Sequence, residues 1–194
     1  MQRLDSWQDA ALWPVRLQLA EGTSWTLWGN GGGEKDYLLS QDDKILIFPG
    51  SAKLIDFLRR GEGCNFSRQP GYQEIRNLVL AGEVAAELTP TYFYPLLDVR
   101  SLLAQRPWSW GTSDCSIILN CFNLLWDAAH TINAEWIIER FKGRKSEAGR
   151  FLDELTFITA SELPDFQTRY QESAVSEVYD QSLERVARKC VLRD

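Results

Sequence analysis

The 194-residue sequence has very little histidine and methionine, with one residue of each. Most acid–base and nucleophilic catalysis depends on histidine, and zinc sites draw on clustered histidine and cysteine. The cysteines, at positions 64, 115, 121 and 190, are dispersed, with no CxxC pair. The sequence therefore predicts no metal site and no cofactor. It also predicts four reduced, mostly buried thiols.

Long apolar runs are also missing. No stretch approaches the roughly 20 apolar residues that span a bilayer. The first twenty residues carry Asp5, Asp9 and Arg16 where a signal peptide would need an apolar core. We therefore expect no membrane insertion and a cytoplasmic, bacterial protein.

The single histidine, His130, lies on one polar helical stripe with Ser116, Asn120, Asn123 and Asp127. A catalytic triad is excluded because Ser116 and Asp127 would lie about 16 Å apart along a helix. Asp127 and His130 could still touch across one turn. The pattern favours a solvated helix face over a polar contact with another segment, and it predicts no catalytic residue.

A glycine-rich stretch, Gly29–Gly33, invites a phosphate-binding interpretation. It lacks the GK[ST] ending of a P-loop, and Glu34 occupies the sixth position of a GxGxxG register, where it would repel phosphate. The stretch is predicted to be a hairpin loop. A magnesium site built from carboxylates stays open as an alternative.

Short runs with a two-residue period dominate the first fifty residues. Val15–Leu19, Ser24–Trp28, Tyr37–Leu39 and Ile45–Phe48 are separated by polar or glycine-rich turns. This pattern predicts an antiparallel β-meander of about four strands. Tyr92–Leu97 is expected to be an edge strand or irregular, because Pro95 cannot donate to a ladder.

Helical periodicity dominates the rest of the chain. Helices are predicted over 51–60, 72–81, 112–130, 151–158 and 175–186 from apolar spacing, capping residues and glycine stops. The fold class is therefore α+β, with an N-terminal antiparallel β-meander followed by helices packed on one face and a helical C-terminal third. We expect a single domain over 1–194, with a possible sub-boundary near 142–146.

Eight tryptophans stand out in a chain of this length. Trp108 and Trp110 follow Arg106-Pro107 in a loop ahead of the predicted 112–130 helix. Tryptophan and arginine are enriched at interface hot spots, so Arg106, Trp108 and Trp110 are predicted to bind a partner. The pattern nevertheless favours the other interpretation, in which both indoles anchor the loop to the core. Trp28 is a further candidate, because Trp25 and Trp28 would lie on opposite faces of a strand.

Charge is distributed unevenly. The chain carries a net charge of −6, yet residues 140–150 hold five basic side chains against one acid. The basic stretch predicts either a solvated face or steering of a charged protein partner through Arg140, Lys142, Arg144 and Lys145. A sequence pI of about 5.0 argues against nucleic acid.

These features together favour a non-catalytic cytosolic protein that binds another protein. An adaptor, an assembly factor or an inhibitor such as a toxin-immunity protein would fit. The alternative is a histidine-independent enzyme that uses carboxylates in a cleft, with two carboxyls about 5 to 9.5 Å apart. Its oligomeric state does not follow from the sequence.

Overall fold

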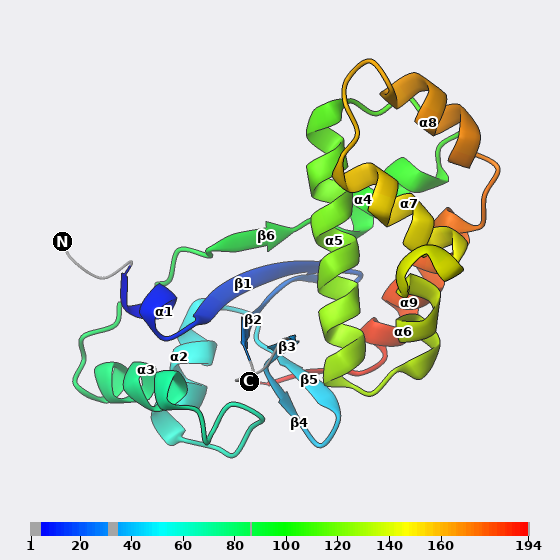
Figure 1. Ribbon diagram of the computed structural model, residues 1–194. Coiled ribbons are helices and arrows are strands. Elements are labelled where there is room, and N and C mark those ends of the chain that lie inside the picture. Colours follow the sequence, from blue (N-terminus) through cyan, green and yellow to red (C-terminus); the bar gives the residue numbers. More distant parts are fainter. Residues whose placement is uncertain (1–4, 31–34, 86, 194) are drawn as a thin grey trace. The chain divides into compact units, whose positions relative to one another are not determined.

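The computed structural model describes residues 5–30, 35–85 and 87–193 (Figure 1). The chain divides into two compact units, one formed by Met1–Phe93 with Lys189–Asp194 and the other by Tyr94–Arg188. The chain therefore leaves the first unit, builds the whole second unit, and returns to the first with its last residues. The stretch 142–146, suggested by its charge as a sub-boundary, lies inside the second unit.

The first unit combines two small sheets with three helices. Its elements are α1 (Asp5–Asp9), β1 (Leu12–Leu19), β2 (Gly22–Asn30), β3 (Asp36–Leu38), β4 (Ser40–Gln41), β5 (Lys44–Ile47), α2 (Ser51–Arg60), α3 (Pro70–Leu80), β6 (Tyr92–Tyr94), which ends at the boundary, and β7 (Cys190–Leu192).

The strands differ in part from a single meander. One sheet has the order β3-β2-β1-β6, with β1 and β2 forming an antiparallel hairpin. The other has the order β4-β5-β7, in which β5 pairs parallel with β7. Residues 45–48 are predicted to be the fourth meander strand, but β5 lies in the second sheet, and Phe48 forms an isolated bridge back to Trp25. The sequence could not show this, because the partner strand lies more than 140 residues further along the chain.

Helices α2 and α3 pack against each other, and α2 also contacts β2. Their apolar residues pack with Leu12, Leu27 and Phe48 into a buried core. Helix α2 ends as predicted, because Gly61 adopts φ +69° and its N–H bonds to the carbonyl of Phe57. β6 is an edge strand, as expected, but it spans only Tyr92–Tyr94. Leu96 and Leu97, expected in the same edge strand or irregular segment, begin a helix instead.

The second unit is helical. Its elements are α4 (Leu96–Ala104), α5 (Thr112–Thr131), α6 (Glu135–Phe141), the 3₁₀ turn η1 (Gly143–Lys145), α7 (Glu147–Thr156), α8 (Leu163–Tyr170) and α9 (Val175–Ala187). Helix α5 contacts α4, α6, α7 and α9, so it is the central helix of this unit. Aromatic rings fill the core, where the ring centroid of Phe122 lies 4.9 Å from that of Tyr179 and 5.8 Å from that of Phe151. The α+β prediction is confirmed.

Candidate functional site

Trp108 and Trp110 are buried, with 5% and 6% of their surface exposed. Their ring centroids lie 5.4 Å apart, and the Trp108 Nε1–H donates to the carbonyl of Leu103 at 3.1 Å. Phe151 packs on Trp108 and Phe166 on Trp110. Both indoles therefore pack as core anchors of the loop, and they do not offer the exposed rings that the partner-binding interpretation needs. Sequence position identified the loop, but the rings that cover it come from α7 and α8.

Arg106 is exposed yet its guanidinium is engaged within the second unit. It lies 4.4 Å from the Trp108 ring centroid and donates to the carbonyl of Leu103 at 2.6 Å. It also donates to Ser176 Oγ at 2.8 Å. These contacts connect the loop to the start of α9. Arg106 therefore stabilises the loop, independently of any partner.

Trp28 lies in the first unit, within a cluster of aromatic rings. Its centroid is 5.0 Å from that of Trp13 and 5.9 Å from that of Tyr92. The Arg16 guanidinium lies 5.8 Å from the ring of Trp25. Trp25 and Trp28 are both half-buried, so neither is presented in full to solvent.

The four predicted basic residues lie on α6, η1 and the turn between them. Lys142 pairs with Glu139 at 3.4 Å and Arg144 with Asp153 at 2.6 Å. Arg140 stacks on Trp136, and Lys145 is exposed. Local acids therefore neutralise Lys142 and Arg144, whereas the described residues form no ion pair with the exposed Arg140 and Lys145.

Sequence reasoning missed a groove in the second unit, formed by α7, α8 and the segment between them. It has a volume of about 380 Å³. Its lining combines apolar rings with charged side chains, namely Arg144, Asp153, Glu154, Phe157, Ile158, Glu162, Asp165, Phe166 and Arg169.

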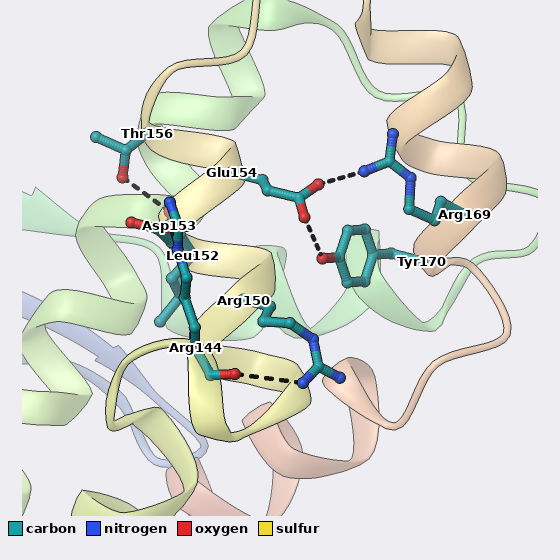
Figure 2. A network of polar contacts seen from close by, with 8 residues as sticks. All are labelled: Arg144, Arg150, Leu152, Asp153, Glu154, Thr156, Arg169 and Tyr170. Carbon is teal, nitrogen blue, oxygen red and sulfur yellow. Dashed lines mark hydrogen bonds and ion pairs between the residues drawn. The ribbon is translucent and has the colours of Figure 1, made fainter.

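Glu154 links the two helices of the groove (Figure 2). Its carboxylate accepts a hydrogen bond from Arg169 at 2.5 Å and another from the Tyr170 hydroxyl at 3.0 Å. Burial, followed by this hydrogen bond, raises the pKa of Tyr170 to about 12. Figure 2 also shows Arg150 donating to the carbonyl of Arg144, which supports the arginine that pairs with Asp153. The groove walls are thus fixed by ion pairs.

Phe157 and Glu162 lie at the rim of the groove. Phe157 follows the last residue of α7 and has 79% of its surface exposed. Glu162 accepts hydrogen bonds from the hydroxyl and the backbone N–H of Thr159, which lowers the pKa of Glu162. A general acid needs the opposite shift. The geometry therefore suits binding better than acid–base chemistry.

The groove carries an excess of negative charge. Two of its four carboxylates pair with its two arginines, and the other two belong to Glu162 and Asp165. A ligand that complements this surface would combine apolar area with positive charge.

The comparison with protein families decides where this chain belongs. The model of the SatS C-terminal domain family matches residues 12–186. The chain belongs to the SatS C-terminal domain family. A solved structure described as "The crystal structure of SatS c-terminal domain in complex with bromine" has a TM-score of 0.74 and 16% identity to it. That similarity covers 99% of this chain and 98% of the other, and at this identity it establishes the fold alone. No curated protein matches the chain.

The cysteines of this SatS C-terminal domain family member differ in exposure, since Cys115 and Cys121 are buried and Cys64 and Cys190 are half-buried. All four cysteines are free, and burial raises the pKa of the Cys121 thiol to about 12. Within residues 5–30, 35–85 and 87–193, no three His, Cys, Asp or Glu side chains gather as metal ligands would. None of the helices described is long and apolar enough to cross a membrane. Of the predicted glycine loop, residues 31–34 lie outside the described part of the chain.

One sequence signal could have revealed the groove in this family member. Phe151, Leu155 and Ile158 mark the apolar face of the predicted helix, and Phe157 lies off that face. A large aromatic residue off the apolar face, in a stretch rich in acids, is a candidate for surface contact. Only the structure shows that α8 stands opposite it.

Proposed function

We propose that this protein acts by binding another protein, and that the groove between α7 and α8 is the contact surface. Phe157 carries the proposal, since it exposes 79% of its surface beside a hollow of about 380 Å³. Aromatic residues are enriched at interfaces, and burying such a ring in a partner removes a large apolar area from water. A cytoplasmic bacterial adaptor, assembly factor or inhibitor, such as a toxin-immunity protein, fits this proposal.

The polar contacts support binding because they organise the groove in advance. Glu154 ties α8 to α7 through Arg169 and Tyr170, and Arg144 pairs with Asp153 on α7. A surface that is already ordered loses less conformational entropy when a partner docks. Glu162 and Asp165, which form no ion pair with the described residues, favour a partner segment that carries basic as well as apolar side chains.

The carboxylate enzyme is less well supported as a function. Such chemistry needs one carboxyl that keeps its proton near neutral pH beside one that does not. In this groove Asp153 and Glu154 are engaged by arginines, and hydrogen bonding lowers the pKa of Glu162. These contacts do not separate an acid from a base.

Site-specific crosslinking tests the proposal. A photo-crosslinking phenylalanine analogue at position 157, in the native host, should give a discrete crosslinked product with one other protein. The matched control is the same analogue at Leu80, which is 52% exposed on α3 of the first unit. Products of equal yield and pattern from both positions, or none from position 157, would contradict the proposal.

A second variant separates binding from folding. Phe157→Ser should change the free energy of unfolding by less than about 0.5 kcal/mol, because the ring is largely in solvent. It should nevertheless remove the partner captured at a second groove position, Asp165. A partner retained by a stable Phe157→Ser protein would show that the ring is not an anchor.

A further inference from the structure

Trp136 carries two arginines on one indole ring. The Arg140 guanidinium, at the end of α6, lies 5.3 Å from the ring centroid, and that of Arg185, on α9, lies 4.4 Å from it. Both distances fall within the range of cation–π attraction. Trp136 is half-buried and both arginines are exposed, so the cluster lies at the surface of the second unit.

No described side chain neutralises either guanidinium with an ion pair. The nearest acids in sequence are already engaged, since Glu139 pairs with Lys142 and Glu184 pairs with Arg100 and Arg188. The Trp136 ring keeps the two positively charged guanidiniums close together and does not neutralise their charge. Such an arrangement raises the local positive potential above that of a single exposed arginine.

The hydrogen-bonding edges of these arginines are also available. Each guanidinium has five N–H donors in its plane, whereas a cation–π contact uses the face of that plane. A carboxylate can take two parallel hydrogen bonds from one such edge. Because both groups sit on one ring, a single short segment can reach the two of them.

We propose that Trp136, Arg140 and Arg185 form a binding site for a short acidic segment of a partner protein. The indole supplies apolar contact, and the two guanidiniums bind one carboxylate each. None of these three residues lines the groove of α7 and α8. The acidic-segment site goes beyond the proposed function, because it does not depend on binding at that groove.

The surrounding charge favours an acidic peptide over a nucleic acid. The whole chain has a net charge of −6, and Glu139 and Glu184 flank the two arginines in sequence. A continuous run of phosphates would meet these acids on both sides. Two or three carboxylates placed over the Trp136 ring would not extend as far as Glu139 and Glu184. The site therefore fits a short cluster of acidic residues.

A labelled glycine-serine peptide with three central glutamates tests the site on the full chain at low salt. Fluorescence anisotropy should show binding to the wild-type protein and much weaker binding of the same peptide with three glutamines. The double variant Arg140→Gln, Arg185→Gln should weaken glutamate-peptide binding at least about tenfold, because charged hydrogen bonds are lost. Arg140→Lys with Arg185→Lys should fall between, since it keeps charge but loses the planar fork.

The matched control is Arg59→Gln with Arg60→Gln, which removes the same charge from exposed arginines on α2. It should bind like wild type, and equal weakening would reduce the effect to net charge and overturn the proposal. Equal affinity for the two peptides would also overturn it. The proposal would also be overturned if inorganic phosphate displaced the glutamate peptide at an equal concentration. It would be overturned as well if a single-stranded DNA oligonucleotide bound more tightly than the glutamate peptide. Phe157→Ser should bind the peptide normally, so failure here leaves the crosslinking result at position 157 independent.

Discussion

Trp108 is held by three kinds of contact at once. Its ring packs on Trp110 and Phe151, its Nε1–H bonds to the carbonyl of Leu103, and the Arg106 guanidinium covers its face. Phe157, by contrast, has no such cover and stands in solvent. Trp108 therefore serves stability, whereas the exposed ring of Phe157 is the anchor of the binding that we propose.

Trp108→Ala should lower the free energy of unfolding by about 3–5 kcal/mol, because it empties a packed position and removes one of the hydrogen bonds to the Leu103 carbonyl. Denaturant unfolding followed by circular dichroism measures this. Trp108→Phe keeps a ring and should cost clearly less. An unchanged unfolding midpoint for Trp108→Ala would mean that the indole does not anchor the loop.

At the scale of the element, helix α5 has one buried and one solvated face. Cys121, Phe122 and Leu125 are buried, whereas Ser116, Asn120 and Asn123 are exposed. The solvated interpretation of the polar stripe holds for its first three members, and Asp127 and His130 are half-buried. The helix begins at a glycine N-cap, where Asp114 accepts from the Gly111 N–H at 2.8 Å.

Two substitutions on α5 should separate its faces. Leu125→Ala should cost about 2–5 kcal/mol of unfolding free energy, because Leu125 is fully buried. Ile117→Ala removes an aliphatic side chain from the same helix at a position 38% exposed, and should cost less than about 1 kcal/mol. Thermal or urea unfolding gives both values, and equal losses would contradict the orientation of α5.

At the scale of the whole molecule, the C-terminal residues complete the first unit. The Ile45 N–H donates to the carbonyl of Lys189 at 2.9 Å, and the Arg193 N–H donates to that of Ile47 at 2.9 Å. Strand β7 is thus the parallel partner of β5. The first unit cannot finish this sheet until the chain has passed through the second.

Removing residues 189–194 should therefore remove the backbone hydrogen bonds that β5 makes with β7. The buried Ile45 amide loses its acceptor and should exchange with deuterium at least about tenfold faster. The Leu46 amide, which bonds to Leu39 at 2.9 Å, is the internal control and should change much less. If both amides keep their wild-type exchange rates, the pairing of β5 with β7 contributes nothing to this sheet.

The α+β class, the helices α2, α3, α5, α7 and α9 and the β1–β2 hairpin were predictable because each is encoded locally, whereas α1, α4, α6 and α8 were not predicted. Periods of 3.6 and 2 and a glycine at a left-handed helix end act within a few residues. The parallel pairing of β5 with β7, the burial of Trp108 and Trp110, and the groove facing Phe157 were decided by tertiary structure. The strand pairing and the burial of the indoles depend on segments distant in the chain, and the groove depends on how α7 and α8 are placed against each other. A local pattern shows that a side chain is apolar without showing which surface will cover it.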